Sequence, residues 1–312
     1  MKKAFAITAG IILLCMVSIP ALAGWTVVNL NPAGATQSWA VGVSGGQEVG
    51  HTDVGGKKHA RVRSGTAASW VDLNPKGATE SHASGVSGGQ QVGYATIGRN
   101  DHASLWSGTA ASWVDLNPAG ATDSYARGVS GGQQVGRAEV GGKTHAGLWS
   151  GTAESWVDLH PLGATSSSAS GVSGGKQVGD ATIDWDIHAS LWSGTAQSWV
   201  DLHPAGAQDS YAHGVSGGQQ VGEAYIGRTK EYWDYMAEER SGGEWHAGIW
   251  SGTAKSWVDL HALLPAGVYS ESRAYSVDVR AGEILVTGFA TTTAKGGGKD
   301  VVWHYVPEPS PK

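Results

Sequence analysis

Cysteine is almost missing from this 312-residue sequence, whose single copy is Cys15. Cys15 lies in an N-terminal segment that we expect to be removed, which leaves a chain without a thiol. Such a chain forms no disulfide, holds no Cys-ligated zinc and performs no thiol catalysis. Charge is also scarce: charged residues make up 15%, with 21 Lys and Arg against 27 Asp and Glu. This balance offers no basic surface to a phosphate backbone, so we expect no nucleic-acid partner.

Long apolar runs are confined to the N-terminus. Two lysines precede an apolar stretch over 4–17, and a run of small residues ends at Ala23. This order is typical of a secretory signal peptide, and the apolar stretch is shorter than the ~20 residues of a membrane span. The sequence therefore predicts a signal peptide at 1–23, cleaved near Ala23–Gly24. We expect a secreted, extracellular or periplasmic product with no membrane span in the mature chain.

Glycine and tryptophan are abundant, with 48 and 15 copies, and their spacing is periodic. The pattern Ser-Gly-Thr-Ala-x-Ser-Trp-Val-Asp-Leu recurs five times, at intervals of 43 residues and, before the last copy, 58 residues. A period of about 40–45 residues, rich in Gly and β-branched residues, is typical of the four-stranded blades of a β-propeller. The tryptophans of this pattern are Trp70, Trp113, Trp156, Trp199 and Trp257.

Each repeat divides into four short strand candidates. In the third repeat these are Ser124–Ser130, Gln133–Val140, His145–Trp149 and Ser155–Leu159. The first two are separated by Gly-Gly, which predicts a tight hairpin because both glycines can adopt a positive φ. A linker that contains proline leads to the next repeat, and proline suits a linker because it cannot donate to a sheet.

The number of strand copies predicts how the repeats close. The first strand occurs six times, but a fourth-strand copy, Trp25–Leu30, precedes all of them, and the last set, which ends at Val306, lacks a fourth strand. The economical arrangement is an all-β, six-bladed β-propeller of 43-residue four-stranded repeats over 24–306. The N-terminal strand would join the last blade and leave no open sheet edge. An open solenoid is the alternative, and 307–312 form a proline-rich tail.

The third strands carry a further motif, His-Ala-x-Leu-Trp, as at His102–Trp106, His145–Trp149 and His188–Trp192, with His246–Trp250 a close variant. These runs resemble the extracellular HAF-repeat family. The resemblance implies a secreted bacterial β-repeat protein, and it supplies no catalytic residues. The C-terminal Val-Pro-Glu-Pro that begins at Val306 resembles the start of a truncated PEP-CTERM sorting signal.

Residues that recur in every repeat are expected to build the blades. We interpret the periodic tryptophans as packing between sheets, and the five histidines at the start of the third strands as donors to a neighbouring backbone or hydroxyl group. Gly-Val-Ser-Gly-Gly matches a hydrolase nucleophile pattern, but it lies in a hairpin and recurs five times. The loop Asp184–Asp186 lacks the further oxygen ligands of a calcium loop, so we expect no cofactor, and calcium binding is unsupported.

Residues that differ between repeats gather on one face of the predicted propeller. They include the residue before each first strand and two residues within it, which would surround the mouth of the central channel. Aromatic, cationic and acidic groups in one place predict a ligand pocket, and the alternative is a channel filled with water. The candidate binding residues are Trp39, Glu80, His82, Asp123, Tyr125, Arg127, Asp209, Tyr211, His213, Glu271, Arg273 and Tyr275.

An insertion over 226–245 lengthens the fifth repeat on the same face. Its middle, Lys230–Arg240, is the one helix that we predict in the mature chain. Tyr232 and Trp233 would give this helix an apolar side, which either packs on the propeller or binds a partner. Both residues therefore join the candidate binding residues.

These features favour a secreted, non-enzymatic propeller that binds a glycan or an extracellular protein through its variable face. A purely structural scaffold outside the cell is the alternative. A carbohydrate-active enzyme, a hydrolase or a lyase, is a weaker hypothesis, since glycoside hydrolysis needs paired carboxylates. Its candidates would be Glu80, Asp123, Asp209 and Glu271, with His82 and His213 as proton carriers. The oligomeric state is left open.

Overall fold

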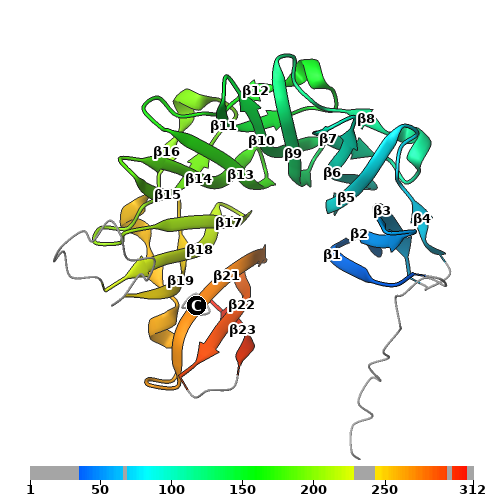
Figure 1. Ribbon diagram of the computed structural model, residues 1–312. Coiled ribbons are helices and arrows are strands. Elements are labelled where there is room, and N and C mark those ends of the chain that lie inside the picture. Colours follow the sequence, from blue (N-terminus) through cyan, green and yellow to red (C-terminus); the bar gives the residue numbers. More distant parts are fainter. Residues whose placement is uncertain (1–34, 66–68, 228–242, 294–296, 308–312) are drawn as a thin grey trace, which may run out of the picture.

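The computed structural model describes residues 35–65, 69–227, 243–293 and 297–307. These residues form six antiparallel sheets, each built from strands that are consecutive in the chain (Figure 1). Five sheets have four strands, and the last, β21-β22-β23, has three. The bounds of the strands are β1 (Ser38–Ser44), β2 (Gln47–Val54), β3 (Lys57–Ser64), β4 (Val71–Asp72), β5 (Ala78–Ser87), β6 (Gln90–Ile97), β7 (Asn100–Trp106), β8 (Val114–Asp115), β9 (Ala121–Ser130), β10 (Gln133–Val140), β11 (Lys143–Trp149), β12 (Val157–Asp158), β13 (Ser166–Ser173), β14 (Lys176–Ile183), β15 (Asp186–Trp192), β16 (Val200–Asp201), β17 (Ser210–Ser216), β18 (Gln219–Ile226), β19 (Glu244–Trp250), β20 (Val258–Asp259), β21 (Tyr269–Arg280), β22 (Glu283–Thr292) and β23 (Gly298–Tyr305).

The predicted Gly-Gly hairpins join the first two strands of the repeats. Between β9 and β10, Gly131 and Gly132 have φ of 58° and 79°, the left-handed values that a two-residue hairpin requires. The turn between β14 and β15 has no glycine at the two left-handed positions. Asp184 and Trp185 adopt φ of 49° and 78° there. The Trp185 side chain projects into solvent and is 85% exposed.

The fourth strand is shorter than the sequence predicts. In the third blade the segment expected to be a strand over Ser155–Leu159 begins instead in the 3-10 turn η3 (Ala153–Ser155), and the strand β12 covers only Val157–Asp158, followed by a hydrogen bond from the Leu159 N–H to the Ala146 carbonyl of β11. The hydroxyl of Ser155 accepts the Ser150 backbone N–H at 2.8 Å and donates to the Thr152 carbonyl at 2.6 Å. Because these side-chain bonds favour a turn over an extended backbone, the strand starts two residues later.

The core consists of apolar seams between consecutive blades. Trp149 of the third blade is fully buried and packs with Leu105 and Leu116 of the second. Its indole N–H donates to the Leu116 carbonyl at 2.7 Å, across the seam. The equivalent Trp106, Trp192 and Trp250 are also fully buried, which confirms the prediction that the third-strand tryptophans pack between sheets.

In the second to fifth blades the fourth-strand tryptophans adopt two arrangements, which follow the identity of the third-strand residue that contacts the ring. Where that residue is serine, as at Ser104, the Trp113 indole N–H donates to its hydroxyl at 2.9 Å. Where it is glycine, as at Gly147, the Trp156 ring occupies the space of a Cβ and packs on Trp149, with ring centroids 4.6 Å apart. The fifth blade repeats the second arrangement.

The innermost strands follow one another around a common axis. β1 contacts β5, and the series continues through β9, β13 and β17 to β21. No contact of comparable extent joins β21 back to β1 within the described residues, and Figure 1 shows the first and last blades apart. The strand expected to close the last blade, Trp25–Leu30, lies outside the described residues, so closure stays a prediction. No helix in the described part of the chain is long and apolar enough to cross a membrane.

Candidate functional site

A bulge in each innermost strand aims one side chain away from the blade. In the third blade, Ala126 pairs with Gly136 and Gly128 with Val135, which leaves Arg127 as the extra residue. β-Bulges of this kind redirect side chains and are common beside functional sites. The extra residues of the six blades are Val41, Ser84, Arg127, Ser170, His213 and Tyr275.

A second variable position lies two residues before each extra residue, and it pairs with a variable residue on the neighbouring strand. Tyr125 pairs with Arg137, and His82 pairs with Tyr94. We use the name axial belt for fourteen of the side chains at these positions, which are aromatic or charged apart from Ser168. The belt comprises Trp39, His51, His82, Tyr94, Tyr125, Arg127, Arg137, Ser168, Asp180, Tyr211, His213, Glu223, Arg273 and Tyr275.

Sequence reasoning found the first-strand half of this belt, except Ser168, and missed the second-strand half. The missed residues are His51, Tyr94, Arg137, Asp180 and Glu223, each of which follows a glycine of the second strand. The signal was available, because this position differs from blade to blade while the glycine before it does not. Comparison of the repeats along the second strand would therefore have found these residues.

Aromatic rings form a continuous series across the first three blades. Trp39 stacks on His51 at 4.5 Å between ring centroids, and His51 lies 4.2 Å from His82 in the next blade. His82 stacks on Tyr94 at 5.5 Å, and Tyr94 meets Tyr125 edge to face at 5.2 Å. The Arg137 guanidinium then covers the Tyr125 ring at 4.9 Å from its centroid, a cation–π contact. The first half of the belt is therefore a wall of aromatic rings.

Charged groups dominate the other half of the belt. Glu223 is buried, and its carboxylate lies 3.5 Å from the Arg273 Nε and 3.8 Å from the His213 Nε2. Burial raises the pKa of the Asp180 carboxyl to about 6, while Arg127 and His213 act in the opposite direction. In the aromatic half, burial lowers the pKa of His82 to about 4, so the His82 imidazole is neutral near pH 7.

Several polar atoms of the belt are buried and have no hydrogen-bond partner within the described part of the chain. Buried polar groups in proteins are normally paired with protein, water or ligand atoms, so a concentration of unpaired ones marks a place where polar partners bind. The atoms are His51 Nδ1, His82 Nδ1, Arg137 Nε and Ser168 Oγ, together with His213 Nε2 and Glu223 Oε2, which form no hydrogen bond but lie 3.8 Å from each other. All six belong to the belt.

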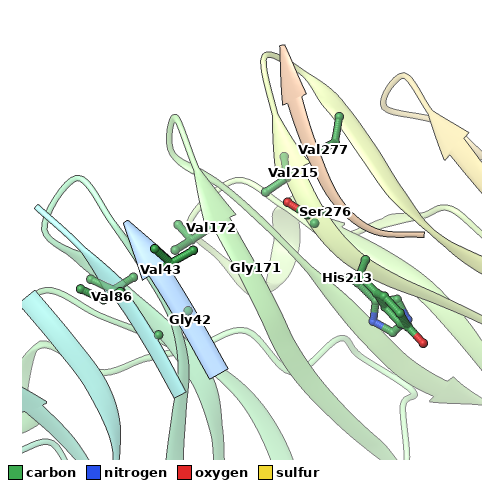
Figure 2. Close-up of a pocket in the computed structure, with 14 residues that line it drawn as sticks. Gly42, Val43, Val86, Gly171, Val172, His213, Val215, Ser276 and Val277 are labelled. Atoms are coloured by element: carbon green, nitrogen blue, oxygen red, sulfur yellow. The ribbon is translucent and has the colours of Figure 1, made fainter. Parts of the chain in front are cut away.

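A cavity of about 270 Å³ adjoins the belt on the side of the Gly-Gly hairpins. Every blade contributes to its wall through the Gly-Val or Ser-Val pair that follows the bulge, as with Gly171–Val172. Figure 2 shows His213 on the same inner strand as Val215, farther from the hairpin turn. The cavity therefore has an apolar end near the hairpins and a polar end at His213 and Tyr275.

The four carboxylates predicted to lie just before the first strands have two kinds of surroundings. Asp123 accepts the backbone N–H of Asp101 at 2.8 Å, and Asp209 accepts that of Ile187 at 2.9 Å. Each of these two therefore fastens its own blade to the preceding one. Glu80 and Glu271 are half-buried beside the belt. Tyr232 and Trp233, and the helix predicted over Lys230–Arg240, lie outside the described residues.

The five repeated histidines bind aspartates, and the expected backbone or hydroxyl partner was wrong. In each of the first five blades the Nδ1 of the third-strand histidine donates to the Oδ2 of the fourth-strand aspartate, at 2.7 to 2.9 Å. The aspartate's second oxygen accepts a backbone N–H two residues later in four of the blades. The pairs are His59–Asp72, His102–Asp115, His145–Asp158, His188–Asp201 and His246–Asp259.

A second histidine stacks on this pair in the third, fourth and fifth blades. His160 lies 4.0 Å from His145 between ring centroids, and its Nε2 donates to the Ala164 carbonyl at 3.0 Å. Its Nδ1 lies 2.8 Å from the Ser167 hydroxyl, which donates to it. Burial and the neighbouring His145 lower the pKa of His160, which favours this neutral form. In the first two blades an asparagine replaces it and accepts the same serine hydroxyl.

The raised pKa of Asp180 gives a prediction for stability. A folded-state pKa near 6, above the ordinary value of 3.8, means that the proton stabilises the folded chain at low pH and that this contribution is lost as pH rises through 6. Asp180→Asn mimics the protonated form at every pH. The unfolding free energy of the variant minus that of the wild type should rise by about 1–3 kcal/mol between pH 4 and pH 7. Denaturant titrations at both values measure it, and a constant difference would contradict the assigned environment.

No family model matches the chain, and no curated protein is similar to it in sequence. Solved structures are similar at low identity. Puromycin hydrolase has a TM-score of 0.50 and 11% identity over 85% of this chain and 45% of that one. A post-proline cleaving enzyme from Rickettsia typhi has 0.49 and 10% over 85% and 46%. TolB from Acinetobacter baumannii has 0.46 and 13% over 70% and 52%.

This chain thus spans about half the length of those structures. At such identities the similarity concerns the fold alone. The arrangement of the blades and the likeness to the puromycin hydrolase structure show that the described part of the chain is all-β and has the β-propeller fold.

Proposed function

We propose that this chain is a secreted, non-enzymatic propeller that binds a carbohydrate at the axial belt. The observation that carries the proposal is the belt's composition: aromatic rings on one side, charged groups on the other, and buried polar atoms without a hydrogen bond in both halves. Sugars have apolar faces that stack on aromatic rings and hydroxyl groups that bind carboxylates and guanidinium groups. Ligand sites in general combine apolar walls with a few directed polar groups.

Secretion belongs to the same proposal. It is supported by the basic and apolar N-terminal segment that ends near Ala23, and by the resemblance of the third-strand motifs to extracellular HAF repeats. An excess of acidic over basic residues favours solubility outside the cell and disfavours anionic ligands. We therefore expect the carbohydrate to be neutral or basic.

A glycoside hydrolase is the second candidate, and one observation favours it. The pKa of Asp180, raised by burial to about 6, is in the range of a general acid. Hydrolysis also needs a second carboxylate about 5–10 Å away, and the other buried carboxylate of the belt, Glu223, is engaged with Arg273. If the enzyme hypothesis holds, Asp180→Asn keeps sugar binding and abolishes release of reducing ends.

The carbohydrate proposal predicts that the belt variants Tyr94→Ala and Tyr125→Ala weaken binding. Each removes a ring of the aromatic wall, so affinity for the tightest-binding sugar should fall about tenfold to a hundredfold, corresponding to roughly 1.4–2.8 kcal/mol. A glycan array with the purified wild type identifies the sugar, and calorimetry measures its Kd for each variant.

Trp185→Gly is the matched control for these variants. It also removes an aromatic ring, but one at an exposed turn outside the belt, and glycine suits the positive φ at that position. Binding should be unchanged in this control. An array without any hit, or affinities equal in all four proteins, would refute the carbohydrate proposal. A protein that the wild type captures and the belt variants release would replace the sugar as the ligand.

A further inference from the structure

The fifth blade brings together three side chains that can ligate a metal, away from the belt. They are Glu244, the first residue of β19; His246, on the same strand; and His261, in the 3-10 turn η6 (His261–Leu263). One ligand atom from each lies within 4.8 Å of the other two. Imidazole and carboxylate groups are the ligands that zinc and similar divalent ions take in proteins without thiols.

His246 is already oriented as a ligand. Its Nδ1 donates to the Asp259 carboxylate at 2.8 Å, so the neutral ring carries its lone pair on Nε2. A carboxylate behind the histidine fixes the tautomer and increases the basicity of the ligating nitrogen, which is the usual support of metal-bound histidines.

His261 differs from its counterparts in the third and fourth blades. His160 and His203 each donate Nε2–H to an alanine carbonyl, at 3.0 and 3.1 Å, so that nitrogen cannot ligate. His261 keeps the Nδ1 contact with its serine, Ser272, at 2.8 Å, but that serine lies 11 residues later instead of 7. With the longer linker, no residue of the described chain pairs with the His261 Nε2. That nitrogen is free to ligate when Nδ1–H donates to Ser272.

The third ligand also distinguishes this blade. At the place of Glu244, the third blade has Lys143, whose charge would repel a cation, and the fourth has the shorter Asp186. Glu244 is exposed and can turn toward the two rings, which stack at 4.3 Å between centroids. Ligand atoms on a tetrahedral zinc, with bonds of about 2.0–2.1 Å, lie roughly 3.4 Å apart. This spacing compares with the limit of 4.8 Å within which the three ligand atoms lie here.

We infer that Glu244, His246 and His261 form a zinc-type divalent metal site on the fifth blade. Asp259 positions His246, and Ser272 positions His261. Three protein ligands leave a fourth coordination position for water or for an oxygen or nitrogen atom of another molecule. The site is independent of the axial belt, so its failure would leave the carbohydrate proposal untouched.

Metal titration of the full chain, purified without a polyhistidine tag and treated with chelator, tests the site. Calorimetry with Zn²⁺ should show one ion per chain, and Co²⁺ should give the visible absorption of a four-coordinate ion. His261→Asn should weaken binding at least a hundredfold. This variant is expected to fold, because Asn74 and Asn117 occupy the same position and accept the serine hydroxyl at 2.7 and 2.6 Å.

The matched control is His160→Asn in the third blade, the same substitution beside Lys143. It should leave zinc binding unchanged. Glu244→Gln should weaken binding about tenfold or more and leave the thermal unfolding temperature of the metal-free chain unaltered, since Glu244 is exposed. The inference is overturned if the wild type binds no zinc at millimolar concentration, or if His160→Asn loses as much affinity as His261→Asn.

Discussion

Replacing Trp192 with alanine should lower the free energy of unfolding by about 3–5 kcal/mol. The indole is fully buried in the seam between the third and fourth blades, where it packs with Leu148 and Leu159. Unlike Trp149, its N–H has no partner among the described residues, so the loss is one of packing alone. The substitution leaves a cavity that rigid sheets on both sides cannot fill, and guanidinium denaturation followed by circular dichroism measures the cost.

Trp185→Gly serves again as the control for this substitution. It removes the same side chain from an exposed turn, and its unfolding free energy should stay within about 1 kcal/mol of the wild type. If Trp192→Ala also changed stability by less than 1 kcal/mol, the seam between these blades would not be the core that the structure shows.

Gly179→Ala should destabilise the chain by about 3 kcal/mol or more and abolish binding at the belt. A Cβ at Gly179 would lie 2.0 Å from the Ser168 carbonyl oxygen and 2.8 Å from the Ala169 Cα. Both are backbone atoms of the inner strand, so the pairing of β13 with β14 must open at the bulge. Asp180, the next residue, would move with the strand and leave the belt.

Gly174→Ala is the matched control in the same blade. Gly174 lies in the hairpin turn with φ of 57°, and no atom lies near the added methyl group. Its cost should be limited to the left-handed backbone, about 1–2 kcal/mol, with sugar binding retained. Equal stability losses in Gly179→Ala and Gly174→Ala would show that the close approach at the bulge does not exist.

The fold could be predicted because the repeats act as an internal alignment. Recurrence of the strand-four tryptophans gave the blade length, and Gly-Gly gave the hairpins that Gly131 and Gly132 form. The fourth strand was predicted too long because hydrogen bonds of the Ser155 hydroxyl favour a turn, and strand propensity does not register them. Closure by Trp25–Leu30 remains a prediction.

The site could be predicted only in part. Tyr125, Arg127 and His213 were found because the first strand differs between repeats, and the bulge that aims Arg127 and His213 emerges only from the pairing with the second strand. The histidine–aspartate pairs depend on the register between third and fourth strands, which no local pattern gives. The cluster at His261 depends on a linker whose extra length frees one nitrogen, a consequence visible only beside His160.

A crystal structure of the protein soaked with mixed oligosaccharides tests the central claim most directly. The account predicts sugar density in the axial belt, with a ring stacked on Tyr94 or Tyr125 and hydroxyl groups within hydrogen-bond distance of Asp180, Arg137 or His213. Sugar density elsewhere on the molecule, or a belt that holds only water while the array shows tight binding, would contradict it.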